Sequence, residues 1–480
     1  MGNENKMEKR YGLLTAICMV VGIVIGSGVF FKAQTILQAT GGDMKVGVAA
    51  WIIGGLIMLA CILAFAIMAT MYEKVNGVVD YAEALVGEKY AYIIGWFMAV
   101  IYFPSMTGVL AWLTARYTLV FITSVNPAIA MTEGGPVTGS EAMVLALFFL
   151  CGAYAINALS PKLAGKFQVT TTFAKLIPLG LMMVVGVIYG LMNGQLAENF
   201  SGEALAAVTE TGSASGNALF AAIVSTAFAY EGWVIATSIN SELKNAKRNL
   251  PIALVVGGLV IMAVYIFYFI GVAGGATTQQ LMDEGATSAF LNIFGNVFGN
   301  ILNLFIAVSC AGTLNGLMLA TTRGLFSLAA RGKGPKPEMF SVVDPATKMA
   351  GNSSIFGLLF AAIWLVHFYG SNLAPHNWFG IFGFDSSELP IITTYLLYLP
   401  IFFMFMKKHP ELGFVKRFLI PGLAMIGSAF MVFAAAYSHG YKPFLAAQAN
   451  GTFSCPVLFY LVLFAAATIL GIMLDASRKK

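Results

Sequence analysis

Long apolar runs, separated by short polar or charged clusters, dominate the pattern of hydrophobic and polar positions along the chain. Most of these runs reach or approach the roughly 20 residues that a helix needs to cross a hydrocarbon core about 30 Å thick. The pattern predicts an all-α membrane protein with twelve transmembrane helices. The segments lie near Leu13–Leu37, Val46–Tyr72, Ile93–Phe121, Ala142–Leu159, Phe167–Leu191, Ala218–Ile239, Ile252–Ala273, Val297–Ala320, Ile355–Tyr369, Ile391–Met406, Phe418–Tyr437 and Val457–Leu474.

Composition supports the membrane assignment. Of the 480 residues, 59% are hydrophobic and only 10% are charged, and the mean hydropathy is +0.82. A soluble domain carries about 25% charged residues, because its surface faces water. Most of this surface must therefore face lipid. The net charge of +5 is small and spread over loops, so we expect membrane lipid, and no nucleic acid, as a partner.

The distribution of Lys and Arg predicts the topology. Short cytoplasmic loops accumulate these residues, and with the N-terminus inside, most of the 27 basic residues fall in one alternate set of loops. The longest polar stretch, Arg323–Ser354, belongs to that set. We therefore expect a multi-pass protein of the plasma (inner) membrane with both termini cytoplasmic.

Two of the twelve segments carry interruptions near the middle of the membrane. The first contains Gly22, Gly26, Ser27 and Gly28, and the sixth contains Glu231 followed by a glycine. Glycine costs about 1 kcal/mol relative to Ala in a helix, and a charge at the bilayer centre costs at least ~2.5–3.5 kcal/mol. A single cluster could simply allow close helix packing. Paired interruptions in corresponding spans of two halves instead favour an inverted-repeat transporter with its site at the midplane.

This interpretation divides the chain into four parts. Residues 1–192 form the first inverted repeat with its cytoplasmic N-terminus, and residues 193–215 form an external loop. Residues 216–408 form the second repeat. Residues 409–480 add two further helices and the cytoplasmic C-terminus.

The interruptions also predict a binding chemistry. An unwound turn exposes N–H groups at the start of one half-helix, here those of Ser27, Gly28 and Val29, which suit a carboxylate. It also exposes carbonyl groups, here near Ile23–Ile25 and Phe228–Ala229, which suit an ammonium group. A free α-amino acid carries both charges a short distance apart. Glycine at 26 and 28 lets a ligand approach the backbone without a Cβ in the way.

Several motifs resemble the amino acid–polyamine–organocation (APC) superfamily, and within it the bacterial L-type amino-acid transporters of the serine/threonine and alanine–serine–cysteine exchanger type. The resemblance implies a LeuT-like fold of two inverted five-helix repeats plus two extra helices. It also implies main-chain recognition of small neutral L-amino acids at the two breaks. The motifs are Gly26–Phe30, Ala174–Pro178, Phe228–Trp233, Glu242–Pro251 and Gly312–Gly316.

The family pattern assigns roles to individual residues. Phe228 would act as an aromatic gate over the site. The ammonium of Lys175 would take the position of a bound sodium ion, together with Gly22 and Ser309, which implies sodium-independent transport. Read on its own, Lys175 could instead snorkel to the interface. The implied substrate-binding set is Ile23, Ile25, Gly26, Ser27, Gly28, Val29, Phe228, Ala229 and Glu231.

Some residues have more than one reading. Glu231 stands where many family members have a smaller residue, and it could touch substrate or be a satisfied structural carboxylate. Tyr102 could line the site but is read as core packing, and Arg116 as reaching the membrane interface. The five cysteines are read as small buried hydrophobes. The four histidines stand at span ends or in loops, without metal-ligand spacing: His367, His376, His409 and His439.

The sequence therefore predicts a secondary transporter that exchanges small neutral L-amino acids by alternating access, with no cofactor and no metal. A proton-coupled symporter that uses Lys175 is the alternative. A membrane-embedded enzyme is remote, because the chain has no HExxH motif, nucleophile elbow or paired intramembrane carboxylates. Animal family members join a glycoprotein through a cysteine after span three. Residues 123–139 contain no cysteine, so no disulfide-linked heavy-chain partner is expected.

Overall fold

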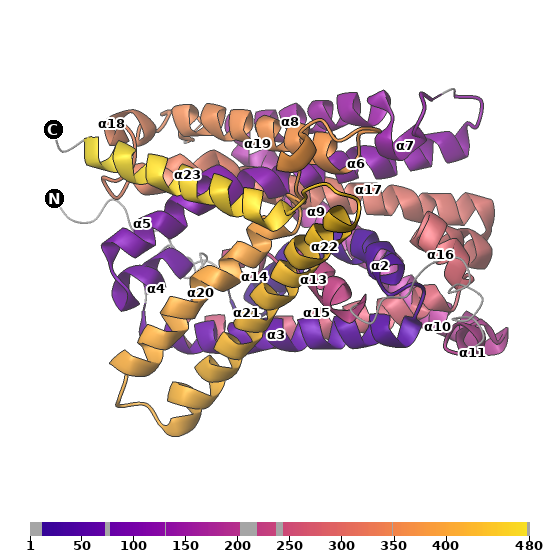
Figure 1. Ribbon diagram of the computed structural model, residues 1–480, viewed down its shortest axis with the longest axis horizontal. Coiled ribbons are helices and arrows are strands. Elements are labelled where there is room, and N and C mark those ends of the chain that lie inside the picture. Colours follow the sequence, from indigo (N-terminus) through magenta and orange to yellow (C-terminus); the bar gives the residue numbers. More distant parts are fainter. Residues whose placement is uncertain are drawn as a thin grey trace.

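The structure, a computed structural model, describes residues 12–72, 77–129, 131–201, 218–236, 243–347 and 349–477. These residues form helices and their connections (Figure 1). The side chain of Ile23, residues 202–215 of the predicted external loop and Glu242 of the motif after span six lie outside the described residues.

The helices of the first half run to Asn199. They are α1 (Leu13–Val24), α2 (Gly28–Ala39), α3 (Met44–Met71), α4 (Val78–Leu85), α5 (Glu88–Phe97), α6 (Phe103–Val125), α7 (Gly135–Thr138), α8 (Ser140–Leu159), α9 (Pro161–Leu181), α10 (Val187–Met192) and α11 (Gln195–Asn199). Two π-helical turns, η1 (Met98–Tyr102) and η2 (Met182–Gly186), join α5 to α6 and α9 to α10.

The remaining helices begin at Ala218. They are α13 (Ala218–Tyr230), α14 (Trp233–Ala236), α15 (Ala246–Ala273), α16 (Thr278–Glu284), α17 (Ala286–Ala329), α18 (Pro337–Phe340), α19 (Gly351–Asn372), α20 (Leu389–Lys408), α21 (Ile420–Ala436), α22 (Lys442–Ala449) and α23 (Pro456–Ser477). The short turns η4 (Gly380–Phe382), η5 (Val415–Leu419) and η6 (Tyr437–Tyr441) complete this part.

Ten helical stretches among the described residues are long and apolar enough to cross a membrane. They correspond to predicted spans two to five and seven to twelve. The predicted first and sixth spans are instead the shorter apolar helices α1 and α13, each followed by a second helical piece after a break. The structure thus agrees with an all-α membrane fold, and the count of twelve crossings stays a prediction.

The outer surface of the helices is apolar where lipid would lie. In α23 only 11% of the most apolar 18-residue window is buried inside the protein. Its exposed side chains include Val462, Ile469, Leu470 and Met473. Other helices expose large apolar side chains as well, among them Phe148 of α8, Phe173 of α9 and Ile426 of α21. Such apolar surface marks a membrane or protein interface.

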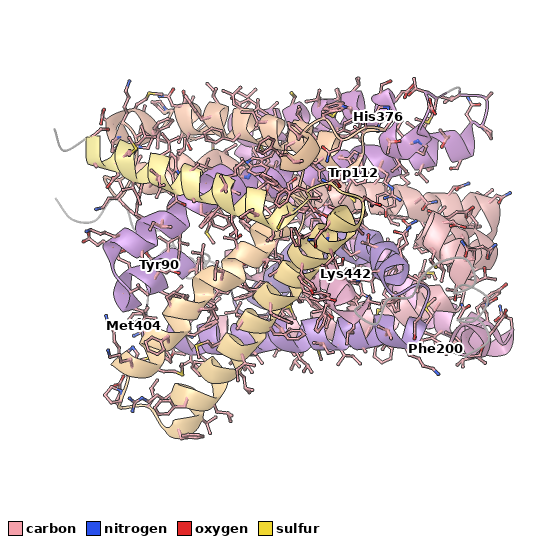
Figure 2. The ribbon with its side chains drawn as sticks, in the orientation of Figure 1. Tyr90, Trp112, Phe200, His376, Met404 and Lys442 are labelled. Atoms are coloured by element: carbon pink, nitrogen blue, oxygen red, sulfur yellow. The ribbon has the colours of Figure 1, made fainter. Side chains whose placement is uncertain are left out.

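The helices pack in two groups. In the first helix group α1 and α15 pack together, α2 packs on α13, and α3 packs on both α13 and α15. In the second helix group α6 packs on α8, α17 and α19. Helix α9 packs on α17 of the second group, and η2 after it packs on α15 of the first. Trp112, labelled in Figure 2, lies fully buried where α6 meets Phe31 of α2 and Phe368 of α19.

The connections gather at two opposite ends of the bundle (Figure 1). Helices α4, α5 and α18 lie at one end, which we name the basic face because its loops carry the basic clusters. Helices α7, α11 and α16 lie at the other end, which we name the opposite face. The two sets of loops that the Lys and Arg pattern assigns to different sides of the membrane are therefore separated in space.

Cysteine burial differs from the expectation. Cys61 and Cys310 are buried, but Cys18 and Cys151 are exposed and Cys455 is intermediate. An apolar side chain on a membrane helix can face lipid as well as the protein interior, so apolar context alone does not predict burial.

Candidate substrate site

The first break separates α1 from α2. Helix α1 ends at Val24, Ile25 is extended with φ −68° and ψ 96°, and α2 begins at Gly28. Ser27 is buried and its side chain does not cap α2. No backbone carbonyl of the described chain accepts from the N–H groups of Ser27, Gly28 and Val29. The start of α2 therefore has three N–H groups without a backbone acceptor among the described residues, and their role as ligand donors stays a prediction.

The second break lies between α13 and α14. Helix α13 ends at Tyr230, Glu231 and Gly232 form a turn, and Trp233 begins α14. Gly232 has a φ of +104°, which a residue with a Cβ rarely adopts. A glycine is thus required at the position where the predicted sixth span changes direction.

The two breaks lie against each other. A Cβ built on Gly28 would stand 2.5 Å from the Cα of Ala229, so the start of α2 and the end of α13 are in backbone contact. The hydroxyl of Tyr265, from α15, lies 2.9 Å from the carbonyl oxygen of Val24 and 3.0 Å from that of Ala229. One side chain therefore spans both interruptions, and we name this region the joined breaks.

Tyr265 donates to carbonyl groups that the sequence predicts to be free for a ligand. The sequence predicts free carbonyls near Ile23–Ile25 and Phe228–Ala229, yet Val24 and Ala229 each have the Tyr265 hydroxyl as a donor within reach. A hydroxyl carries one proton and satisfies one carbonyl at a time. At any moment at least one of the two carbonyl groups therefore receives no hydrogen bond from Tyr265.

Lys175 lies beside the first break. It is 1% exposed, and its ammonium donates to the carbonyl oxygen of Gly22 near the end of α1. The hydroxyl of Ser309, from α17, donates to the carbonyl oxygen of Gly26 at 3.4 Å. Helices α9 and α17 thus both reach the first break, and Lys175 points into the protein rather than toward the membrane interface.

Glu231 is held by a residue that the sequence reading assigned to packing. The hydroxyl of Tyr102, from η1, donates to Oε1 of Glu231 at 2.6 Å, and Tyr102 is only 1% exposed. A buried carboxylate needs hydrogen-bond donors. Tyr102 in the neighbouring third span was available from the sequence as such a donor, and the sequence reading did not pair it with the carboxylate.

Between Phe228 and the opposite face lie an aromatic ring and two basic side chains. Its ring meets that of Phe31 edge-on with centroids 6.1 Å apart. The ammonium of Lys32 lies 5.0 Å from the Phe31 centroid and 5.3 Å from the Phe228 centroid. The Arg116 guanidinium lies 5.8 Å from the Phe31 centroid and donates to Gln34; its predicted position at the membrane interface stays a prediction.

The predicted site residues therefore fall into one region. The first break, the second break, Lys175 and Ser309 lie together, and Phe228 stands beside the joined breaks. Within the described parts of the chain, no group of three or more His, Cys, Asp or Glu side chains could hold a metal ion.

Two interrupted helices that meet inside a helical membrane bundle define the class of secondary transporters with a substrate site near the midplane. The chain belongs to the amino acid permease family, whose family model matches residues 11–467. It is therefore an amino-acid transporter rather than an enzyme.

Individual relatives are similar along most of the chain. The serine/threonine exchanger SteT of Bacillus subtilis is 31% identical over 440 residues, which cover 89% of this chain and 91% of SteT. The mouse b(0,+)-type amino acid transporter 1 is 25% identical over 435 residues, covering 89% and 82% of the two chains. The human cystine/glutamate transporter is 26% identical over 344 residues, covering 70% and 64%.

Proposed function

We propose that this transporter exchanges small neutral L-amino acids by alternating access and that the joined breaks bind the substrate. The observation that carries the proposal is the contact between Gly28 and Ala229. It lies beside the N–H groups at the start of α2, which donate to no backbone carbonyl of the described chain. The N-terminus of α2 attracts a carboxylate through these donors and the helix dipole. The carbonyl groups at the end of α13 attract an ammonium group within the same small space.

The choice of small neutral substrates rests on two points. Both ionisable side chains beside the breaks already have partners: Lys175 has the Gly22 carbonyl and Glu231 has the Tyr102 hydroxyl. Neither side chain therefore needs a polar group of the substrate side chain as a hydrogen-bond partner. SteT, a relative at 31% identity, is named a serine/threonine exchanger, which favours substrates of that size.

The packing of corresponding helices supports two inverted repeats, residues 1–192 and 216–408, followed by residues 409–480. Under that division α3 and α15 are each the second span of a repeat, α6 and α17 the third, and α8 and α19 the fourth. Each of these pairs is in contact, which fits an internal two-fold axis that passes between the paired helices. Transport would then rock the first helix group against the second.

The proposed topology puts the basic face in the cytoplasm and the opposite face, with residues 193–215, outside a plasma membrane. Its support is the concentration of Lys and Arg in the loops of one end. Residues 123–139 contain no cysteine, so the proposal includes no disulfide-linked heavy chain.

The proposed coupling is sodium-independent exchange. A buried ammonium at Gly22, close to the Ser309 contact with Gly26, supplies the positive charge that a sodium ion would otherwise supply. The same geometry supports a second candidate, proton symport, in which Lys175 would release its proton during the cycle. A buried lysine is suited to that role because burial disfavours its charged form.

Uptake of labelled serine into proteoliposomes tests the proposal. Vesicles preloaded with serine are compared with empty vesicles at equal salt and pH on both sides. Exchange predicts strong uptake only with internal serine. Equal uptake into empty vesicles would contradict obligatory exchange, and its response to an imposed pH gradient would then decide on proton symport. Absence of uptake of serine, alanine, threonine and cysteine by folded protein would refute the substrate class.

A further inference from the structure

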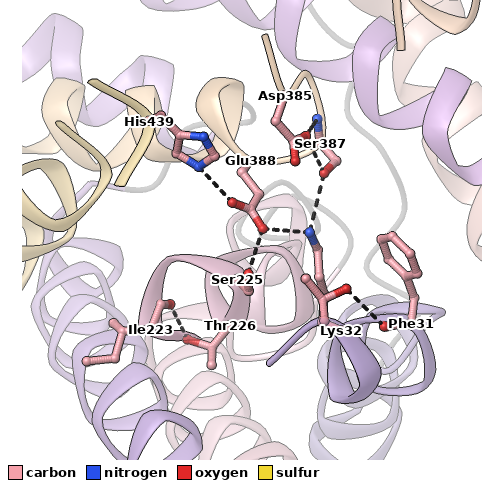
Figure 3. Close-up of polar contacts among 10 residues, drawn as sticks. Phe31, Lys32, Ile223, Ser225, Thr226, Asp385, Ser387, Glu388 and His439 are labelled. Carbon is pink, nitrogen blue, oxygen red and sulfur yellow. Dashed lines mark hydrogen bonds and ion pairs between the residues drawn. The ribbon is translucent and has the colours of Figure 1, made fainter. Parts of the chain in front are cut away.

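A buried ionic cluster lies one turn away from the joined breaks (Figure 3). The ammonium of Lys32 donates to Oε1 of Glu388 at 2.6 Å, and the side chains are only 2% and 5% exposed. The hydroxyl of Ser225 donates to the same oxygen at 2.8 Å. Nε2 of His439 lies 2.9 Å from Oε2, and Ser387 accepts from Lys32 at 3.4 Å.

The cluster joins elements that are distant in sequence. Lys32 lies in α2 and Ser225 in α13, both of the first helix group. Glu388 immediately precedes α20, and His439 lies in η6 after α21. The Lys32–Glu388 pair spans 356 residues. The contact therefore ties the helices that carry both breaks to a neighbouring pair of helices.

The ionic cluster lies between the joined breaks and the opposite face. Lys32 follows Gly28 by four residues and Ser225 precedes Ala229 by four, so each lies about 6 Å from the joined breaks at 1.5 Å per residue. Further along α2, the side chain of Gln34 donates to the carbonyl groups of Met282 and Asp283 on α16, at the opposite face.

The cluster also contacts Phe228, the predicted aromatic gate. The Lys32 ammonium that binds Glu388 lies over the rings of both Phe31 and Phe228. A cation over an aromatic face attracts it, and more strongly where water is excluded. If Lys32 moved away from Glu388, these rings would lose the charge that orients them.

We propose that Lys32 and Glu388 form a latch that positions Phe228 and closes the path from the opposite face to the joined breaks. The latch rests on the alternating access of the proposed function. Removing one partner of a buried ion pair leaves an uncompensated charge in the closed state, whereas an open path lets water reach that charge. Substitution of either residue therefore shifts the protein toward opening at the opposite face.

A thiol reporter at the first break tests the latch independently of transport. Ser309 is fully buried, and its hydroxyl lies 3.4 Å from the Gly26 carbonyl oxygen. Ser309→Cys is introduced into a chain whose native cysteines are replaced by alanine. A membrane-impermeant maleimide is added on the opposite-face side of proteoliposomes. Labelling is compared for the reporter alone and with Lys32→Met, Glu388→Gln or both substitutions.

Each single substitution is expected to raise the labelling rate about tenfold, which corresponds to a loss of about 1.4 kcal/mol of bias toward the closed state. The double variant should be no faster than the faster single variant, because the two residues act through one contact. Lys45→Met and Glu284→Gln are the matched controls. Both residues are exposed near the opposite face, and neither substitution should change the rate.

Unchanged labelling in the single variants that fold would overturn the latch, as would a double variant whose rate increase is the product of the two single increases. If Lys32→Met does not fold, Glu388→Gln still decides. A merely structural contact would lower thermal stability without changing the labelling rate. Serine exchange by the reporter protein is measured in parallel, so that a failure of the proposed function is distinguished from a failure of the latch.

Discussion

Gly28→Ala tests directly whether the contact between the two breaks forms the substrate site. The added Cβ would stand 2.5 Å from the Cα of Ala229 and 3.1 Å from its Cβ. Carbon atoms pack at about 3.5–4.0 Å, so the breaks must separate by roughly 1 Å. The neighbouring atom is backbone, and a rotamer change cannot relieve this clash.

The magnitude follows from the cost of overpacking. Extra carbon atoms in a well-packed interior cost about 1–3 kcal/mol, which is roughly a 5-fold to 150-fold change in an equilibrium constant. Because the strain falls between the groups that would bind the carboxylate and the ammonium, we expect the KM for serine to rise by that factor. The intrinsic helix preference of alanine, about 1 kcal/mol, acts in the opposite direction on stability.

The assay is serine exchange in preloaded proteoliposomes, with the melting temperature of the purified protein measured alongside. Gly152→Ala is the matched control: it lies in α8, and a Cβ there would meet nothing within 4 Å. The control should keep the wild-type KM. If Gly28→Ala exchanges serine with the same KM as the control, the joined breaks are not the binding site.

Four further changes have expected outcomes. Replacing external sodium by choline should leave exchange unchanged, and a loss of uptake would contradict the role given to Lys175. Lys175→Met should lower the exchange rate at least tenfold, because the Gly22 carbonyl loses a buried donor; wild-type rates would remove Lys175 from the mechanism. Tyr265→Phe leaves two carbonyls without this donor and should destabilise the protein by about 1–3 kcal/mol, seen as a lower melting temperature. Tyr102→Phe should raise the KM severalfold because Glu231 loses its 2.6 Å donor, and an unchanged KM would make Glu231 purely structural.

The sequence predicted the two helix breaks, which depend on backbone chemistry. Glycine clusters at Gly26–Gly28 and Glu231–Gly232 interrupt helices for local reasons, namely missing side chains and a buried charge. Their correspondence in two halves predicted a substrate site at the midplane. The structure brings Gly28 and Ala229 into contact, and the substrate site itself stays a prediction. The position of Lys175 beside span one came from the family resemblance and agrees with its bond to Gly22.

Tertiary pairing of side chains could not be predicted in the same way. Lys32, Glu388 and His439 each stand near the end of an apolar segment, where a charge is ordinarily solvated. Only the folded chain brings them within hydrogen-bond distance of one another, across 356 residues in the case of Lys32 and Glu388. The contacts of Arg116 could not be predicted for the same reason, because the rings that surround it come from other parts of the bundle as well as from its own helix.

A structure determined with serine bound to the wild-type protein tests the central claim most directly. The account predicts density for the amino acid at the joined breaks. Its carboxylate should lie within hydrogen-bond distance of the N–H groups of Ser27, Gly28 and Val29, and its ammonium beside the carbonyl groups at the end of α13. Serine bound elsewhere in a protein that exchanges it, with the joined breaks unaltered, would contradict the account.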